Sequence, residues 1–253
     1  MGDGQPWYES AFGRGYLSVY PHRDLASARN EVDHLVRQGL SGRSLDLGCG
    51  FARHTLALAE RGLDAFGMDL SAELLEHARV LETEAQSRAS IRGRLTRGDF
   101  RHLPFRAAVF DAVCMLFSSF GYLDDGGNAR VLREVRRVLR PGGTALLDLM
   151  NTPRVRDGLV PRSVTERGGF RLREDRKLTE GGRRVEKDVC LESVEGGPPR
   201  MWREDVRLFE PEELRALVKR SGLRIERLAG DFDGRPLTPE APRQLVWARA
   251  VTV

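Results

Sequence analysis

The stretch SLDLGCGFARHT, Ser44 to Thr55, leads from a short apolar run into a cluster of small residues and then into a polar segment. This order predicts a strand, a glycine turn and a helix. Chains make such a turn where the backbone must approach a ligand closely, because glycine adopts conformations that other residues avoid. The third glycine of a dinucleotide G-x-G-x-x-G turn is replaced by Arg53, which argues against a nicotinamide or flavin cofactor.

The segments around this turn alternate between patterns typical of strands and of helices. Apolar residues recur at helical spacing in DLASARNEVDHLVRQ (24–38), and short apolar runs separate the helical segments. Strands are predicted at 44–48, 64–71, 94–100, the start of 110–123 and 144–151, and helices at 24–38, 54–62, 72–86 and 128–143. Pro141 and the two glycines after it are expected to end the last of these helices. The alternation is typical of an open parallel sheet with helices on both faces.

After Asn151 the pattern changes. Between 162 and 210 the sequence has period-2 stretches separated by GG and GGPP turn signals. Antiparallel strands with one wet face are predicted over FRLREDRKL (170–178), RRVEKDVCLES (183–193) and MWREDVRLF (201–209). A helix over 211–222 follows, and strands over 223–230 and 244–251 are expected to complete the main sheet. We therefore predict a β insertion between the fifth strand and the last helix.

Composition is typical of a globular chain. Of the 253 residues, 40% are hydrophobic and 31% are charged, which suits one domain of moderate size. No apolar run approaches the roughly 20 residues that cross a bilayer, and the N-terminus lacks a secretory signal, so we expect a cytoplasmic protein. Cys49, Cys114 and Cys190 match neither a zinc pattern nor a disulfide framework, and no metal site is expected.

The formal charge of +4 and the pI of 9.2 raise the question of a nucleic-acid partner. Three of the 41 basic residues are lysine, and the arginines are interleaved with acids, as in FRLREDRK (170–177) and WREDVR (202–207). A basic block is the usual mark of polyanion binding, and none is present in the sequence. The charge pattern therefore argues against nucleic acid.

Three aspartates follow successive predicted strands. Asp46 lies two residues before the first glycine of the turn, Asp69 ends the second strand, and Asp99 ends the third. The carboxyl ends of parallel strands form the crevice in which open α/β sheets bind ligands. There Asp69 can accept both hydroxyls of a ribose and Asp99 an adenine amino group, with Phe100 as a wall for the ring. The ordered set predicts an adenosine-containing ligand.

The chain resembles the class I S-adenosylmethionine-dependent methyltransferases of the broad UbiE-like, small-molecule group. LDLGCGFARHT resembles their first motif, GMDLS the ribose-binding strand end, and GDF the adenine-contacting aspartate. FDAVCMLFSSFGYL and VLRPGG are similar to the fourth-strand motif and the turn before the fifth strand. Ala52 stands at the third small position of the first motif, where alanine is commonly tolerated. The resemblance implies a Rossmann-like seven-stranded sheet with an inserted antiparallel β subdomain, S-adenosylmethionine as cofactor and S-adenosylhomocysteine as product.

The sequence pattern and the aromatic N-terminal residues suggest how the chain is divided. We expect an N-terminal helical lid segment over 1–40, a cofactor-binding domain over 41–151 and 208–253, and a β-rich insertion over 152–207. The insertion covers the substrate, makes a homodimer by strand addition, or does both. The expected cofactor-binding residues are Tyr20, Arg23, Asp46, Gly48, Cys49, Gly50, Asp69, Leu70, Asp99, Phe100 and Phe117.

The implied reaction moves a methyl group from a sulfonium to an O, N or C nucleophile of a small molecule. In-line displacement depends mostly on alignment and exclusion of water, and aromatic walls suit the sulfonium charge. The substrate-binding residues are expected to be Tyr16, Phe120, Tyr122, Asn151 and Arg243. An amine acceptor needs little base assistance, whereas a hydroxyl or carbon acid benefits from a base. The candidate catalytic residues are His22 and His54, with Tyr20 behind them.

Two other functions remain open from the sequence. An RNA methyltransferase is weakened because FSSFGYL (117–123) lacks the N/D-P-P-Y/F type of tetrapeptide used on base amino groups. A protein that binds the cofactor without catalysis is the second alternative, and intact motifs argue against it. A dehydrogenase is disfavoured by Arg53.

Overall fold

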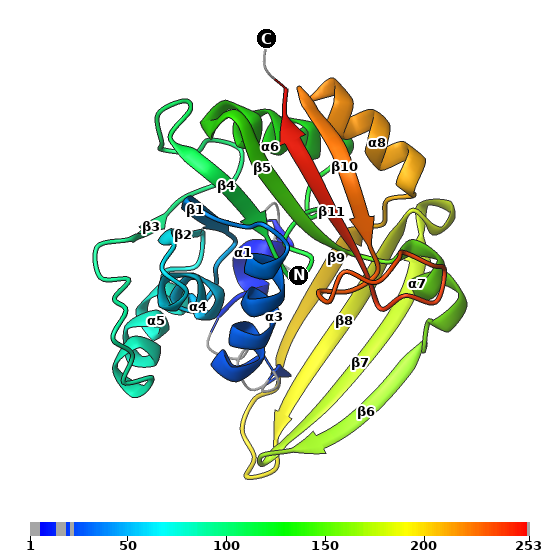
Figure 1. Ribbon diagram of the computed structural model, residues 1–253. Coiled ribbons are helices and arrows are strands. Elements are labelled where there is room, and N and C mark those ends of the chain that lie inside the picture. The colour runs from blue at the N-terminus through cyan, green and yellow to red at the C-terminus, as the bar shows by residue number, and fades with distance from the viewer. Residues whose placement is uncertain (1–5, 14–18, 21–22, 252–253) are drawn as a thin grey trace.

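The computed structural model describes residues 6–13, 19–20 and 23–251 (Figure 1). Its central feature is a seven-stranded sheet, sheet A, with the order β10-β11-β5-β4-β1-β2-β3. In this sheet β11 runs antiparallel to β5 and β10, and the other neighbouring strands are parallel. The strands are β1 (Arg43–Leu47), β2 (Asp64–Asp69), β3 (Leu95–Arg97), β4 (Phe110–Met115), β5 (Leu139–Met150), β10 (Leu223–Ala229) and β11 (Arg243–Ala250). The predicted seven-stranded α/β sheet is confirmed.

Helices cover both faces of sheet A and give it two hydrophobic cores. On one face α3, α4 and α5 bury apolar side chains such as Val32 and Leu56, and on the other α6 and α8 bury Val131 and Leu214. The helices that flank the sheet are α3 (Leu25–Arg37), α4 (Arg53–Glu60), α5 (Ala72–Glu84), α6 (Asp125–Val138) and α8 (Pro211–Arg220). Ser71 caps α5 as expected, since its side chain accepts a hydrogen bond from Leu74 N. In the described part of the chain, no helix is long and apolar enough to cross a membrane.

Helix α6 ends earlier than the sequence predicts. Its last residue is Val138, and Leu139 already has an extended backbone and begins β5. Arg140 precedes a proline, whose ring disfavours the helical conformation at the residue before it. Pro141 therefore ends the helix before the chain reaches the proline itself. The pairing of β4 and β5 then shifts in register, because Phe110 pairs with Leu139 but Ala112 with Thr144.

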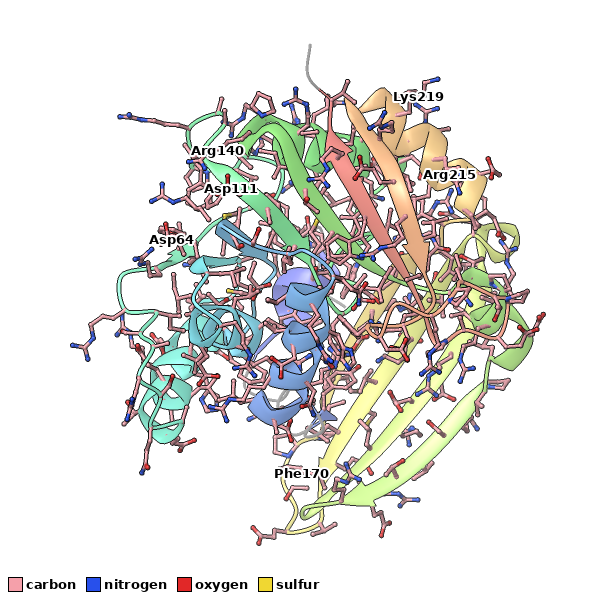
Figure 2. The ribbon with its side chains drawn as sticks, viewed as in Figure 1. Asp64, Asp111, Arg140, Phe170, Arg215 and Lys219 are labelled. Carbon is pink, nitrogen blue, oxygen red and sulfur yellow. The ribbon has the colours of Figure 1, made fainter. Side chains whose placement is uncertain are left out.

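The insertion forms a second, antiparallel sheet, sheet B, with the order β6-β7-β8-β9. Its strands are β6 (Arg162–Arg167), β7 (Phe170–Thr179), β8 (Arg184–Ser193) and β9 (Arg200–Arg207). The three predicted strands are confirmed, but β6 and the helix α7 (Thr152–Gly158) were not predicted. Most residues of β6 are exposed, so the strand lacks the alternation by which a half-buried strand is recognised. Phe170, in the β6–β7 hairpin, lies at the far tip of sheet B (Figure 2).

Figure 1 shows sheet B beyond the carboxyl end of β4, with the N-terminal helices beside it. The short helix α1 (Trp7–Ala11) packs against β9, and α3 packs against α4. Trp7 joins a small hydrophobic cluster with Val185 and Val206 of sheet B. Helix α1 thus lies against sheet B, whereas α3 lies on a helix that covers sheet A.

The opposite end of sheet A is held by charge pairs at the surface. At the start of β2, Asp64 accepts from Arg43 Nε at 2.6 Å, and on β4 Asp111 Oδ1 lies 2.5 Å from Arg140 Nη1 (Figure 2). These side chains are about one-third to one-half exposed, so each pair contributes only about 0–1 kcal/mol. Buried polar side chains such as His54 and Asp148 lie toward the other end of sheet A, where the parallel strands have their carboxyl ends.

Candidate active site

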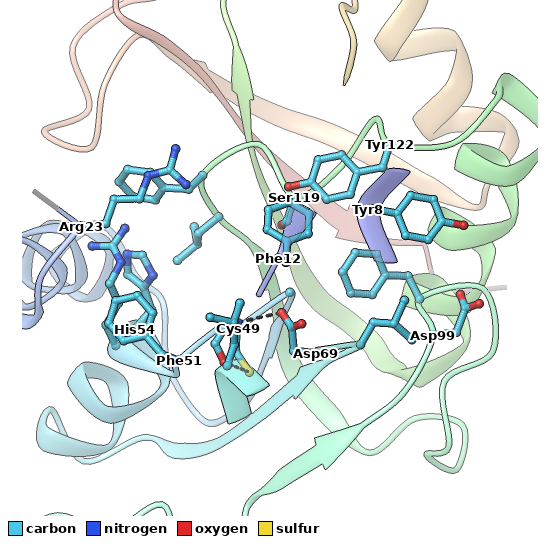
Figure 3. Close-up of a pocket in the computed structure, with 18 of the residues that line it drawn as sticks. Tyr8, Phe12, Arg23, Cys49, Phe51, His54, Asp69, Asp99, Ser119 and Tyr122 are labelled. Atoms are coloured by element: carbon cyan, nitrogen blue, oxygen red, sulfur yellow. Dashed lines mark hydrogen bonds between the residues drawn. The ribbon is translucent and has the colours of Figure 1, made fainter. Parts of the chain in front are cut away.

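The carboxyl ends of β1, β2, β3 and β4 open onto one cleft (Figure 3). The space not filled by protein atoms in and above this cleft is about 910 Å³. This space includes solvent above the cleft, so the cleft is open to the surface of the protein. The lining residues are Tyr8, Phe12, Arg23, Gly48, Cys49, Gly50, Phe51, Arg53, His54, Asp69, Leu70, Leu74, Asp99, Phe100, Leu116, Phe117, Ser119, Tyr122 and Leu123.

The glycine turn after β1 forms the floor of the cleft. Gly48 has φ of +84°, and a Cβ there would meet Ser119 Cβ at 2.8 Å and Phe100 Cζ at 3.0 Å. Gly50 has φ of +55°, and Ala52, which precedes α4, also has a left-handed backbone with φ of 62°. Left-handed backbone at a non-glycine residue costs of order 1–3 kcal/mol and is concentrated at ligand sites. Gly48 therefore has no room for a side chain, and the turn brings its backbone to the surface of the cleft.

Asp69 connects this turn to the end of β2. Its carboxylate accepts hydrogen bonds from Gly50 N and Ser71 N, both at 2.8 Å. Burial raises the pKa of the Asp69 carboxyl, while these backbone hydrogen bonds act in the opposite direction. A carboxylate has about four acceptor sites, so two backbone donors leave capacity for hydroxyl donors of a ligand.

Asp99 lies at the other end of the cleft with Phe100 and Tyr8. The Arg101 guanidinium forms an ion pair with this carboxylate, with Nε 2.9 Å and Nη2 2.5 Å from Oδ2, and the backbone N of Arg101 donates to Oδ1 at 2.8 Å. Burial raises the pKa of the Asp99 carboxyl, but the hydrogen bonds and charge of Arg101 outweigh it, and the net pKa is lowered. Asp99 is therefore an ionised acceptor at neutral pH, as an adenine amino group requires.

Asp46 does not line the cleft, which corrects its predicted place at the ligand. It is buried beneath the turn, and its carboxylate accepts from Thr55 Oγ1 at 2.8 Å. Burial raises its pKa to about 6, although the hydrogen bond from Thr55 lowers it in part. Asp46 supports the start of α4 and through it the turn.

The residues after β4 form a strained wall. Phe117 and Ser118 have φ of 55° and 60°, and a buried aspartate on β5 holds both. Phe117 N donates to Asp148 Oδ2 at 2.7 Å, and Ser118 N donates to the carbonyl of Asp148 at 2.9 Å. Arg243 forms an ion pair with the same carboxylate and stacks 4.5 Å from the Phe117 ring centroid, and Arg53 stacks at 4.2 Å. Arg243 was predicted at the substrate, and the structure places it behind Phe117.

His54 lines the cleft beside Arg53, but its ring is already engaged. His54 Nε2 lies 2.7 Å from Glu31 Oε2. Burial lowers the pKa of His54 well below its usual range, and the charge of Arg53 lowers it further. Burial also raises the pKa of Glu31. A neutral imidazole beside a carboxylate must carry its proton on Nε2 to make this hydrogen bond, so the Glu31 pairing fixes the ring.

Arg23 faces the cleft near His54, at the end away from Asp99 (Figure 3). Its guanidinium lies 5.3 Å from the Phe117 ring centroid and 4.1 Å from that of Tyr20. Tyr20 itself lies behind Arg23 and does not line the cleft. Arg23 therefore lines the cleft, whereas Tyr20 contacts Arg23 and does not line the cleft itself.

Aromatic rings close the Asp99 side of the cleft. Tyr122 stacks on Phe12 with ring centroids 5.6 Å apart, and Tyr8 lies 6.5 Å from Tyr122. Phe12 is held from below, because Ser71 Oγ donates to its carbonyl at 2.6 Å. Thus Tyr122, predicted at the substrate, does line the cleft.

Besides Arg243, two further predicted substrate residues do not line the cleft. Phe120 is buried in the core and stacks on Phe209 at 5.4 Å. Asn151 is buried, and its side-chain amide donates to the carbonyls of Thr238, Pro239 and Ala241. Asn151 therefore holds the loop that contains Thr238, Pro239 and Ala241, and Phe120 packs in the hydrophobic core. Tyr16 and His22 lie outside the described residues.

Sequence reasoning missed several residues that shape the site. Glu31, Asp148 and Phe12 were not predicted to contribute. Asp148 carries a usable signal, because an aspartate within the apolar run TALLDLMN (144–151) must find a partner when buried. In the part of the chain that is described, no group of three or more His, Cys, Asp or Glu side chains can hold a metal ion.

Comparisons with known proteins identify the family of the chain. A family model described as "Methyltransferase domain" matches residues 45–143. The chain is 31% identical over 215 residues to the cypemycin N-terminal methyltransferase of a Streptomyces species, a match covering 82% of this chain and 83% of that protein. It is 29% identical over 230 residues to the dTDP-3-amino-3,4,6-trideoxy-alpha-D-glucopyranose N,N-dimethyltransferase of Streptomyces venezuelae, covering 87% and 92%.

The fold comparison agrees. The solved structure of the CcbJ methyltransferase from Streptomyces caelestis matches with a TM-score of 0.80 and 20% identity, covering 96% of this chain and 99% of that one. At that identity the likeness shows the shared fold, while the similarity in sequence to the cypemycin enzyme extends over most of both chains. The chain therefore belongs to the class I S-adenosylmethionine-dependent methyltransferases, and its cofactor is S-adenosylmethionine.

Proposed function

We propose that this methyltransferase transfers its methyl group to an amine of a small molecule. The observation that carries the proposal is the cleft itself, which has acceptors for an adenosine at one end and a cationic, aromatic wall at the other. Gly48 supports the assignment because a side chain there would clash with Ser119 and Phe100, so the turn that faces the cofactor keeps its shape only with glycine. Relatives that match most of the chain carry N-methyltransferase names, one for a peptide N-terminus and one for an amino sugar.

The cleft residues suggest how the cofactor is oriented. In the proposed orientation Asp99 and Phe100 bind the adenine and Asp69 accepts the ribose hydroxyls, which is supported by the place of all three in the lining of the cleft. Arg23, at the opposite end, is the natural partner of the methionine carboxylate, since a guanidinium pairs with carboxylates through two parallel hydrogen bonds. With this orientation the reacting methyl lies between the two ends of the cleft, with Phe117 on the Arg23 side and Tyr122 on the Asp99 side.

The chain's side chains align the reactants and exclude water. The bound sulfonium supplies a methyl group whose bond to sulfur breaks as its bond to the acceptor nitrogen forms, and the methylated ammonium gives its proton to solvent. Aromatic faces such as Phe117 and Tyr122 stabilise cationic character without offering a competing nucleophile. Among the described cleft residues, His54 is held by Glu31, so an acceptor that needs no strong base fits best.

The N-terminal segment and the insertion would cover the reactants. α1 places Tyr8 over the cleft, Phe12 follows it there, and sheet B lies beyond them. We propose that 1–40 acts as a lid and that 152–207 forms the acceptor side, with a small-molecule amine as the partner.

Calorimetry with S-adenosylhomocysteine and NAD tests the cofactor assignment. The wild type is expected to bind S-adenosylhomocysteine and not NAD. Asp69→Ala should weaken binding about 30- to 150-fold, because it loses charge-assisted hydrogen bonds worth about 2–3 kcal/mol in total. Asp64→Ala is the matched control on the other end of β2 and should bind as the wild type does.

The acceptor class is tested with radiolabelled cofactor and three sets of acceptors: small amines, matched alcohols, and tRNA. Methylation of amines alone supports the proposal. Methylation of tRNA, or of alcohols in preference to amines, overturns it. An Asp69→Ala variant that bound as tightly as the wild type would overturn the ribose assignment without bearing on the acceptor.

A further inference from the structure

A partly buried charge cluster occupies the face of sheet B on which Tyr20 lies. Lys187 Nζ lies 2.8 Å from Glu204 Oε2 and 3.5 Å from Glu174 Oε1. The three side chains are 13–18% exposed, so water screens the cluster far less than a surface pair. Lys187 and Glu204 face each other across the β8–β9 register. The strand pairing therefore fixes the geometry of this pair.

The cluster holds Tyr20 by its hydroxyl group. Tyr20 Oη donates to Glu204 Oε1 at 2.9 Å and accepts from Lys187 Nζ. Trp202 Nε1 donates to the same Glu204 oxygen at 3.2 Å, which fixes the carboxylate from the other side. A hydroxyl that donates to one charged, partly buried partner and accepts from another has one preferred orientation. Sheet B thus determines where the Tyr20 ring lies.

The Tyr20 ring in turn stacks on the Arg23 guanidinium. It lies between two cations, with the Arg23 guanidinium 4.1 Å and Lys187 Nζ 5.0 Å from its centroid. Arg23 N also donates to the Tyr20 carbonyl at 3.0 Å, so the two residues belong to one turn. Stacking of a guanidinium on an aromatic face restricts the plane of its fork. Arg23 then reaches the cleft with a defined orientation.

We propose that Lys187 and Glu204 of sheet B are positioning residues for the methyltransferase, acting through Tyr20 on Arg23. The inserted sheet thereby sets the affinity for the amino-acid end of the cofactor, besides any part it has in covering the acceptor. The proposal rests on the cofactor orientation given under Proposed function. The proposal assigns the change in affinity to the amino-acid end of the ligand, so this change can be distinguished from a loss of folding, which would weaken binding of every part of the ligand.

The test uses two ligands that differ at that end. S-adenosylhomocysteine carries the amino-acid group, and 5′-methylthioadenosine has the same adenine, ribose and thioether without it. In calorimetry on the full chain, Tyr20→Phe and Glu204→Gln are expected to weaken S-adenosylhomocysteine binding at least fivefold. Binding of 5′-methylthioadenosine should change less than twofold. In Arg23→Ala, addition of Tyr20→Phe should have no further effect, because both act on the same contact.

The control variant is Asp188→Asn. Asp188 is next to Lys187 in β8 but on the outer face, where it pairs with Arg203 at 2.7 Å, and its replacement should leave both affinities unchanged. Equal loss of both ligands in Tyr20→Phe, or no loss of either, would overturn the proposal. If Glu204→Gln fails to fold, Tyr20→Phe decides the question alone. A wild type that binds the two ligands equally would instead overturn the cofactor orientation.

Discussion

Asp46 is a buried carboxyl group, and its ionisation is linked to folding. Its pKa is raised by burial from about 3.8 to about 6, so the folded state binds this proton more tightly than the unfolded state does. The stability from this group is fully present below pH 3.8 and is lost as the pH rises through 6. The difference amounts to about 3 kcal/mol. The free energy of unfolding should therefore contain a component that falls between pH 4 and pH 6.

Asp46→Asn should remove that component. Urea unfolding at several pH values should show a slope between pH 4 and 6 that is more negative in the wild type than in the variant. The slope of the free energy of unfolding against pH is compared, because a pH-independent loss of stability from placing an amide beside Thr55 does not change this slope. Asp157→Asn, an exchange at an exposed position of α7, serves as the control and should keep the wild-type slope. Parallel slopes for the wild type and Asp46→Asn would contradict the linkage.

His54 should stay uncharged throughout the neutral range. Burial and the charge of Arg53 lower its pKa well below the usual value, and Glu31 engages Nε2. NMR titration of the ring carbon signals, assigned by loss of the peak in His54→Asn, should show no midpoint between pH 6 and 8. A midpoint in that range would restore His54 as a candidate general base.

At the scale of elements, the turn after β4 depends on a partner from β5. Asp148 fixes the left-handed backbone of Phe117 and Ser118 and is itself completely buried. Asp148→Ala should lower the free energy of unfolding by about 3 kcal/mol, because it leaves Arg243 without its partner and Phe117 N without its acceptor. It should also weaken S-adenosylhomocysteine binding, since Phe117 lines the cleft. Chemical unfolding and calorimetry measure the two effects.

The matched change for this prediction is Asp175→Ala in sheet B. Asp175 pairs with Arg162 at 2.5 Å, but both side chains are exposed. Its loss should cost no more than about 1 kcal/mol and leave ligand binding intact. Comparable costs at the two positions would mean that burial of Asp148 does not matter.

Local pattern predicts most of these elements because strand and helix periods are properties of neighbouring residues. The local pattern predicts an α6 that extends too far toward the C-terminus, because Pro141 disfavours the helical conformation of the residue before it. It misses β6, whose exposed faces leave no alternation. Gly48, Asp69 and Asp99 were found because position at the end of a parallel strand already implies the cleft.

Side-chain direction and long-range pairing are not local, and here the prediction from sequence fails. Phe120 follows β4 closely but points into the core, and Asn151 follows β5 but holds a loop. The pairing of His54 with Glu31 depends on how α3 packs on α4. The contact of Tyr20 with Lys187 joins residues 167 positions apart, a distance over which sequence pattern carries no information.

For the whole molecule, the position of α1 makes a prediction about ligand entry. α1 lies between sheet B and the cleft, with Tyr8 on the cleft side and Trp7 packed on sheet B. α1 has five residues, so its own hydrogen bonds make it only marginally stable, and its contacts hold it in place. Opening of this segment gives a cofactor a route into the cleft, and a bound cofactor adds contacts that oppose opening.

S-adenosylhomocysteine should therefore slow hydrogen exchange of the amides in 7–13. At a hundred times its Kd, a ligand that binds only the closed form stabilises it by about 2.7 kcal/mol, which corresponds to roughly 100-fold slower exchange. The β6–β7 hairpin around Phe170 lies at the far tip of sheet B and is the internal control (Figure 2). Its exchange should not change with ligand. Exchange in 7–13 that ignores a saturating ligand would show that α1 does not cover the bound cofactor, whereas protection of 7–13 alone would identify it as the cover.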